Sequence, residues 1–344
     1  MNNIDTNKEV TIYDIAEKLG LNPSTISRGL KGHFTVSKKT QNKINSTAEE
    51  LGYRTNKFAV NLRMQKTRTI GIIVPRLNSF FMSEVIAGIE SITNDAGYNI
   101  LISQSSENGE KEASNARTMF NSRVDGLMVS LACSMKDIPS FDIFTKRNIP
   151  VLFFDRIPLA KNLPSVTIDN ERAGYLATRH LLEKGAKRII HVTGSQNVSV
   201  YKDRHVGYKN ALELAGIPYN EEFVISNDLS ERSGIACANF VLDNDADGVF
   251  VDNDTCAASC MNELKRQGID IPKQIAFVGF NNDMISRNVD PPLTTINYSG
   301  YEMGKISAKS ILKLLNGIEA STDNVPIILD SFLVERESSN RKPL

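Results

Sequence analysis

The chain has 344 residues, of which 41% are hydrophobic and 23% charged, a composition typical of soluble globular proteins. This length exceeds one ordinary core and suits two or three globular units. No apolar run approaches the roughly 20 residues that cross a bilayer, and the opening MNNIDTNKEV lacks the basic and apolar regions of a signal peptide. These features argue against a membrane or secreted protein, and we expect a cytoplasmic one.

The zero net charge hides an uneven distribution. Residues 1–66 hold 11 Lys and Arg against 6 Asp and Glu, whereas the remainder holds 29 against 34. A basic segment on an acidic chain indicates a polyanionic partner for that segment alone. A charge run is also typical of a solvated surface, so the motif in the same segment has to decide whether residues 1–66 bind a polyanion.

The clearest motif lies in residues 10–32, VTIYDIAEKLGLNPSTISRGLKG. The signals that two short helices require occur here in the right order. Thr11 and Asn22 can each cap a helix start, Gly20 suits the positive φ of a turn, and Pro23 suits a first helical position. With the small Ala16 and the apolar Ile26, this spacing predicts helices over residues 12–19 and from Pro23 onward.

A helix-turn-helix presents the start of its second helix to base edges and phosphates in the major groove. Here those positions are Ser24, Thr25, Ser27 and Arg28. A third helix capped by Ser37 supplies Ile44, Ala48 and Leu51 to close a three-helix core, and its Lys38 and Lys39 suit phosphate contacts. The alternative is a three-helix module for protein contacts.

The pattern changes along the rest of the chain. Residues 55–68 are polar and basic, with an apolar stripe at Phe58, Ala59 and Leu62. From Thr69 onward, apolar β-branched runs alternate with amphipathic helical stretches, which predicts parallel sheets with helices on both faces. Nine or more strands favour two sheets, and the nine runs are 69–75, 99–103, 126–130, 150–155, 165–169, 188–194, 223–226, 248–252 and 274–280.

The four cysteines indicate neither a disulfide framework nor a metal site. Cys133, Cys237, Cys256 and Cys260 include no Cys-x-x-Cys pair. Cys256 and Cys260 share a helix face, without histidines nearby in sequence to complete a site. We expect small, buried, reduced residues, and no metal or other cofactor.

The whole chain resembles the LacI/GalR family of bacterial transcription regulators. The matching residues are Thr11-Ile12-Tyr13-Asp14-Ile15-Ala16, Ser24-Thr25-Ile26-Ser27-Arg28, Val36-Ser37, Leu51-Gly52-Tyr53, Asn56, Ala59, Leu62, Ile70-Gly71 and Pro75. The resemblance implies a small all-α helix-turn-helix head and a two-lobed α/β body similar to periplasmic binding proteins. It also implies a repressor that binds a near-palindromic operator as a homodimer and is controlled by a sugar or sugar-acid effector between the lobes.

The resemblance divides the chain into a DNA-binding domain, a hinge helix with linker, and a ligand-binding and dimerisation domain: 1–54, 55–68 and 69–344. The first lobe is expected at about 69–167 and 297–326, and the second at about 168–296 and 327–344, with crossovers near 168, 296 and 326. The implied DNA-binding residues are Thr11, Tyr13, Pro23, Ser24, Thr25, Ser27, Arg28, Ser37, Asn56, Ala59 and Leu62. Leu62 would wedge into the minor groove; the alternative is packing between domains.

Residues at three strand ends and in one helical motif are predicted to bind the effector. Asp155, Asn253 and Asn281 each end a strand, where ligands of parallel α/β folds bind, and Arg204 lies in an Arg-x-x-Gly-aromatic match. Asp155 and Asn253 are alternatively helix caps, and Arg204 a surface ion-pair partner. The family usually has Asp at position 281.

A lid from the first lobe is expected from Asn78, Phe80 and Phe81, although the phenylalanines are alternatively core residues. Two other classes of protein remain in view. An enzyme is disfavoured because the sequence contains no dinucleotide-binding, Walker or Gly-x-Ser-x-Gly motif, and we expect no catalytic residue. A secreted solute-binding protein is disfavoured by the basic head and the expected absence of a signal peptide.

Overall fold

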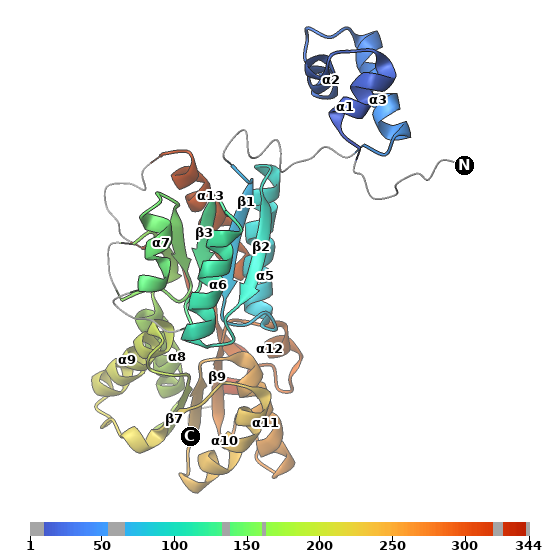
Figure 1. Cartoon of the computed structure of the whole chain (residues 1–344). Coiled ribbons are helices and arrows are strands. Elements are labelled where there is room, and N and C mark those ends of the chain that lie inside the picture. The colour runs from blue at the N-terminus through green and yellow to red at the C-terminus, as the bar shows by residue number, and fades with distance from the viewer. Residues whose placement is uncertain (1–9, 54–65, 133–137, 160–162, 319–325, 342–344) are drawn as a thin grey trace. The chain divides into compact units, whose positions relative to one another are not determined.

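The computed structural model describes residues 10–53, 66–132, 138–159, 163–318 and 326–341. The chain divides into two compact units, Met1–Lys66 and Thr67–Leu344, which we call the head and the body (Figure 1). The hinge positions Asn56, Ala59 and Leu62, and also Cys133, lie outside the described residues.

Within residues 10–53 the head folds into three helices, α1 (Ile12–Leu19), α2 (Pro23–Leu30) and α3 (Lys38–Glu50). The predicted caps are confirmed at all three starts. Thr11 and Asp14 form a reciprocal capping box, Asn22 caps α2 with Pro23 in its first turn, and Ser37 caps α3. These contacts satisfy backbone N–H groups that a helix start leaves without partners.

The head closes around a small apolar core. Ile15, Ile26 and Ile44 are fully buried, one from each helix. Gly20 ends α1 with a φ of 63°, which glycine adopts at little cost. A Cβ added to Gly29 would lie 2.4 Å from Ile44 Cδ1, so α2 approaches α3 more closely than a side chain at 29 permits.

The described residues of the body form two six-stranded sheets, one in each lobe (Figure 1). The first-lobe sheet has the order β11-β5-β4-β3-β1-β2 and the second β12-β10-β9-β8-β6-β7. Strand pairs are parallel except for β10 with β12. The nine predicted strands are all present, and three short ones add to them. The strands are β1 (Thr69–Val74), β2 (Asn99–Gln104), β3 (Gly126–Val129), β4 (Val151–Phe154), β5 (Ser165–Ile168), β6 (Ile189–Thr193), β7 (Val224–Ser226), β8 (Gly248–Val251), β9 (Ala276–Phe280), β10 (Thr294–Asn297), β11 (Ile327–Leu329) and β12 (Phe332–Val334).

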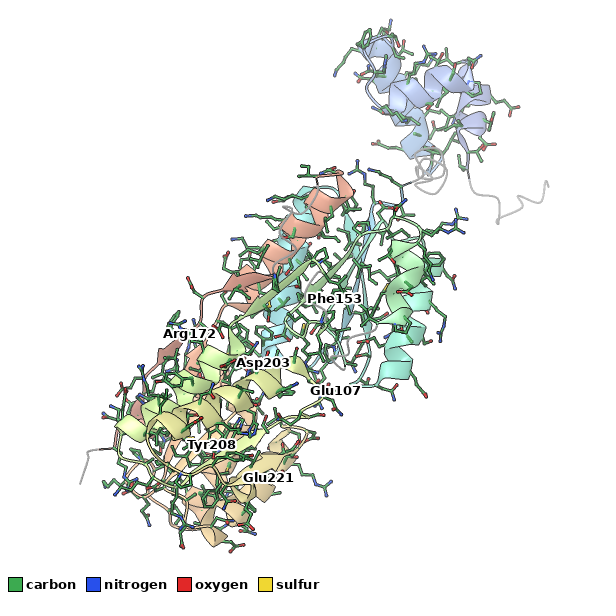
Figure 2. All side chains as sticks on the ribbon, turned by 90° about the vertical axis from the view of Figure 1, so that its left-hand side faces the viewer. Glu107, Phe153, Arg172, Asp203, Tyr208 and Glu221 are labelled. Carbon is green, nitrogen blue, oxygen red and sulfur yellow. The ribbon has the colours of Figure 1, made fainter. Side chains whose placement is uncertain are left out.

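Helices cover both faces of each sheet, as predicted. In the first lobe α5 and α13 pack on one face and α6 with α7 on the other; in the second, α8 and α9 oppose α10 and α11. Figure 2 shows Phe153 within the first lobe, Tyr208 within the second and Glu107 where the lobes meet. The helices are α5 (Phe80–Asp95), α6 (Gly109–Asn121), η1 (Pro139–Phe141), α7 (Asp142–Thr145), α8 (Asn170–Glu183), α9 (Ser199–Leu214), η2 (Glu221–Phe223), α10 (Glu231–Asp243), α11 (Asp254–Arg266), α12 (Met284–Asn288), α13 (Gly300–Leu315) and η3 (Glu337–Ser339).

Three crossovers join the lobes, and one differs from its predicted place. The chain leaves the first lobe between β5 and α8 and returns between β10 and α13, close to the predicted 168 and 296. The third crossing falls between β11 and β12 rather than near 326. Ile327 pairs in parallel with Val166 at the edge of the first sheet, so residues 327–329 belong to the first lobe, not the second.

Cys237, Cys256 and Cys260 are buried and unpaired, as expected. Burial raises the pKa of the Cys256 and Cys260 thiols, which keeps them protonated. Within the described ranges, His, Cys, Asp and Glu form no cluster of three suited to a metal ion. The same ranges contain no helix that is both long and apolar enough to span a membrane.

Candidate functional site

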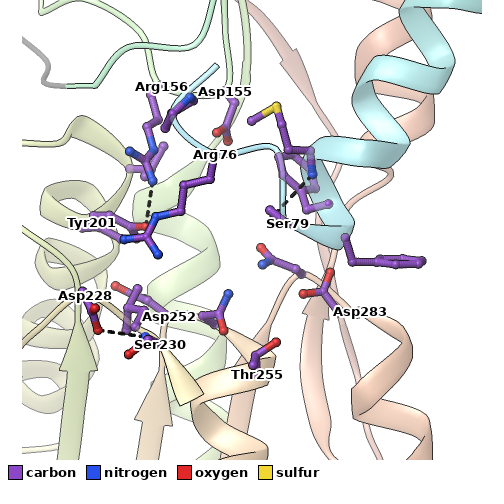
Figure 3. Close-up of a pocket in the computed structure, with 18 of the residues that line it drawn as sticks. Arg76, Ser79, Asp155, Arg156, Tyr201, Asp228, Ser230, Asp252, Thr255 and Asp283 are labelled. Carbon is purple, nitrogen blue, oxygen red and sulfur yellow. Dashed lines mark hydrogen bonds between the residues drawn. The ribbon is translucent and has the colours of Figure 1, made fainter. Parts of the chain in front are cut away.

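A cavity of about 330 Å³ lies between the two lobes of the body. Its volume falls within the range of small-molecule sites. The cavity is lined by loops that follow strands of both sheets and by α9, so the strand ends converge on it as the fold predicts (Figure 3). It brings together all seven predicted ligand-binding residues: Asn78, Phe80, Phe81, Asp155, Arg204, Asn253 and Asn281.

Arg204 is a buried cation held in a fixed orientation. Only 3% of the residue is exposed, which excludes the surface ion-pair alternative. Nε donates to Asn170 Oδ1 at 2.9 Å, Nη1 donates to the Asp252 carbonyl at 3.1 Å, and the guanidinium lies 3.5 Å from the centre of the Phe280 ring. These contacts orient a planar donor group at the cavity wall before any ligand binds.

Two glycines allow α8 and α9 to place Arg204. A Cβ at Gly174 would lie 2.2 Å from the Arg204 carbonyl oxygen, and one at Gly207 would lie 2.0 Å from the Glu171 carbonyl oxygen. The two helices therefore touch through backbone atoms. This close approach brings Asn170, at the start of α8, within hydrogen-bonding distance of Arg204.

Asp155 is a buried acceptor immediately after β4. The Ser130 hydroxyl donates to its carboxylate at 3.4 Å, and its φ of 58° lies in the left-handed region. Burial raises its pKa, and the positive charges of Arg156 and Arg204 oppose that rise. No helix begins in the described residues 156–159 that follow Asp155, so the capping alternative does not apply to it.

Asn253 and Asn281 present amide groups from neighbouring strand ends. Asn253 caps α11, because its side-chain oxygen accepts from the Cys256 N–H at 3.0 Å. The capping alternative therefore holds for the oxygen, whereas the amide nitrogen of Asn253 can donate to a ligand. Asn281 Oδ1 accepts from the Tyr298 hydroxyl at 3.1 Å. An amide at position 281 thus keeps an acceptor without a carboxylate charge.

The first lobe contributes an apolar rim to the cavity. Phe81 is 6% exposed, and its ring centre lies 4.7 Å from that of Tyr298, so it is a core residue that also lines the cavity. Phe80 is 44% exposed and lines the rim without being core. Asn78 lies just before Ser79, the cap of α5.

Comparisons with known proteins agree with this architecture. Residues 11–56 match the family model "Bacterial regulatory proteins, lacI family", and residues 178–339 match "Periplasmic binding protein-like domain". The HTH-type transcriptional regulator RegA of Clostridium saccharobutylicum is 32% identical over 96% of this chain and 99% of its own length. The chain belongs to the lacI family of bacterial regulatory proteins.

Solved structures support the fold of this LacI-family regulator. The structure of a transcriptional regulator CelR-cellobiose complex is 26% identical, with a TM-score of 0.71 over 96% of this chain and 100% of that one. A lac repressor dimer bound to operator and the anti-inducer ONPF has a TM-score of 0.86 over 96% of this chain and 99% of that one, at 24% identity. The chain is therefore a DNA-binding transcription regulator with the two-lobed body of its family.

The head of the LacI-family regulator presents the predicted reading residues on one helix. Ser24 and Arg28 are exposed on α2, while Thr25 and Ser27 are half-buried. Tyr13 on α1 is 68% exposed. Thr11 and Ser37 are occupied in capping α1 and α3, and Pro23 is half-buried at the start of α2. Contact of these residues with DNA stays a prediction.

Sequence reasoning missed an ion network at one end of the cavity. Arg156 donates to both Glu107 oxygens and, at 3.1 Å, to the Tyr201 hydroxyl, and Arg76 Nε donates to Glu107 at 3.0 Å. Figure 3 shows Arg76, Arg156 and Tyr201 gathered together. Arg156 follows Asp155 directly, which was a usable signal, whereas Glu107 lies in a loop 49 residues away.

Asp252 and Asp283 were also missed, although each lies within two residues of a predicted position. The Thr193 hydroxyl donates to Asp252 at 2.6 Å, and His191 Nε2 lies 3.4 Å from the other carboxylate oxygen. Burial raises the pKa of Asp283 to about 6, and a hydrogen bond from Asn281 opposes this rise. Among the described residues, Asp283 Oδ1 is buried without a hydrogen-bond partner.

Proposed function

We propose that this LacI-family regulator is a cytoplasmic repressor that binds a near-palindromic operator as a homodimer and responds to a small sugar-like effector. The observation that carries the proposal is the convergence of both lobes on one cavity, lined by the buried donor Arg204 and the buried acceptor Asp155, in a chain whose separate head is a helix-turn-helix. Binding, rather than catalysis, is the proposed role of the cavity.

The residues at the cavity suit hydroxyl groups. Arg204 is a fixed donor, Asp155 is a fixed acceptor, and the amide of Asn253 adds a donor. Phe80 and Phe81 add apolar surface for the carbon face of a ring. A polyhydroxylated ring presents both donors and acceptors around an apolar face, so it matches this arrangement.

The proposed coupling follows from the lobes. A ligand that contacts both lobes changes the angle between them by hinge motion. In a dimer formed through the bodies, that change would alter the spacing of two hinge segments and heads on the two half-sites of an operator. Such coupling between sites typically amounts to about 1–3 kcal/mol.

A truncation separates the two activities. A chain lacking residues 1–66 should retain effector binding, measured calorimetrically, and lose binding to operator fragments selected with the full chain, measured by gel shift. Operator binding by the truncated body would contradict the proposal. Effector addition to the full chain should change operator affinity at least fivefold, as the coupling range implies.

A further inference from the structure

The charges around the cavity are strongly unbalanced. Of the described residues that line it, three are arginines, Arg76, Arg156 and Arg204, and six carry carboxyl groups, Glu107, Asp155, Asp228, Glu231, Asp252 and Asp283. The surplus is negative. A ligand that enters such a site without its own positive charge leaves buried carboxylates uncompensated.

Most of the arginine charge is already engaged at one end of the cavity. Glu107 forms ion pairs with Arg76 and Arg156. Asp155 lies within electrostatic range of Arg156 and Arg204. Asp228, which is exposed, accepts from Ser230 and from the Ser233 hydroxyl. Glu231 is exposed, and Asp252 accepts from the Thr193 hydroxyl while His191 Nε2 lies 3.4 Å from its other carboxylate oxygen.

Asp283 is a buried lining carboxylate that lacks even such a neighbour among the described residues. It is 5% exposed and lines the cavity, yet within the described part of the chain no cation lies within 4 Å of it, and its Oδ1 has no hydrogen-bond partner. Asn281 donates a hydrogen bond to its carboxylate, and the fully buried Asp254 accepts from its backbone N–H at 2.8 Å. Figure 3 shows Asp283 on the opposite side of the cavity from Arg76 and Arg156.

Arg336 contacts the loop that contains Asp283 without pairing with it. Arg336 donates at 2.6 Å to Asn282, at 3.1 Å to the Ser286 hydroxyl and at 2.7 Å to the Leu293 carbonyl. Its charge is felt by Asp254, whose other oxygen accepts from the Thr295 hydroxyl. The hydrogen bonds of Arg336 therefore hold the loop after β9 in place. The Asp283 carboxylate, which lines the cavity, is left without a cation to pair with among the described residues.

We infer that the effector carries a protonated amine as well as hydroxyl groups, with the amine bound by Asp283. The inference rests on the proposed function, because it names the chemical class of the same effector. The hydroxyl groups would bind between Arg204, Asn253 and Asp155, and the ammonium would lie across the cavity from the arginines. An acidic effector fits less well, since its carboxylate would enter a cavity that already holds a surplus of them.

Matched sugars test the inference on the full chain at pH 7.5. Each series of probes contains a parent hexose, its free amine, its N-acetyl compound and its uronate. The glucose series consists of glucose, glucosamine, N-acetylglucosamine and glucuronate, and the galactose and mannose series are built in the same way. Each compound is titrated calorimetrically. In at least one series, the free amine should bind about tenfold or more tightly than the parent hexose and the N-acetyl compound, as a charge-assisted contact provides. Asp283→Asn should remove that advantage, so that the amine binds this variant no more tightly than the parent hexose does.

A surface variant controls for the loss of charge. Asp270→Asn removes the same charge from an exposed pair with Lys273, outside the cavity, and should preserve the advantage of the amine. Lowering the pH from 7.5 to 5 should weaken amine binding to the natural chain, because the Asp283 carboxylate, with a pKa raised to about 6, becomes protonated. Amine binding to the Asp283→Asn variant should not weaken over the same pH range, because that variant has no carboxylate at position 283 to protonate.

Two results would overturn the inference. If in every series the hexose or the uronate binds as tightly as the amine, and one of them changes operator affinity, the amine assignment is wrong and the proposed function stands. If none of the compounds binds, the inference is also wrong, whereas the role of the head is still decided by the truncation of residues 1–66.

Discussion

Replacement of Gly207 by alanine tests whether the contact between α8 and α9 positions the effector site. The added Cβ would lie 2.0 Å from the Glu171 carbonyl oxygen and 2.5 Å from the Tyr175 nitrogen, both backbone atoms that cannot rotate away. Overpacking of this kind costs about 3 kcal/mol, and the better helix propensity of alanine offsets about 1 kcal/mol. The net loss of about 2 kcal/mol corresponds to a melting temperature lowered by roughly 4–8 °C.

Calorimetric melting of the full chain measures this effect, with Gly109→Ala as the matched control. Gly109 opens α6, and a Cβ there meets no atom within 4 Å, so that variant should melt at or slightly above the natural temperature. Because Arg204 lies one turn before Gly207 on α9, the alanine variant should also respond more weakly to effector. If both variants melted within about 2 °C of the natural chain, the reasoning from the helix contact would be refuted.

Three further predictions concern other parts of the chain. Leu62→Ala should weaken specific operator binding, measured by gel shift, much more than binding to nonspecific DNA; equal losses would disprove a wedge role. Arg204→Ala should abolish the effect of effector on operator binding while leaving operator affinity itself intact, and an unchanged effector response would remove Arg204 from the site. Glu112 accepts from the Ala132 N–H, and burial raises its pKa to about 7. Because the ionised form of Glu112 opposes folding, the stability of the chain falls as pH rises from about 4.5 through 7. Glu112→Gln should therefore stabilise the chain by on the order of 2 kcal/mol at pH 8 and by little at pH 4.5, in denaturant titrations; equal effects at both pH values would contradict this assignment.

The head was predictable because its determinants are local. Capping at Thr11, Asn22 and Ser37 depends on residues two or three positions away, and such signals can be read directly along the chain. The Gly29–Ile44 contact was not predicted. It joins α2 to α3 across a sequence gap, and a glycine within a helix gives no indication of what it will pack against.

The strands of the body were predictable for a similar reason, but their assignment to lobes was less so. Buried parallel strands form continuous apolar runs bounded by polar turns. The short β11 lies just before the third crossover, and its apolar pattern does not indicate which sheet it joins. Its pairing with β5 decides that it belongs to the first lobe.

The sequence by itself determined the helix-turn-helix, the alternation of strands and helices, and the strand-end residues that meet at the cavity, because each depends on local pattern or on the geometry common to parallel sheets. Only the tertiary structure decided which charges face that cavity. The partnership of Glu107 with Arg156 joins loops 49 residues apart, and the isolation of Asp283 depends on every element packed around it. Electrostatic balance in a buried site is a property of the whole packed neighbourhood, so no local pattern reveals it.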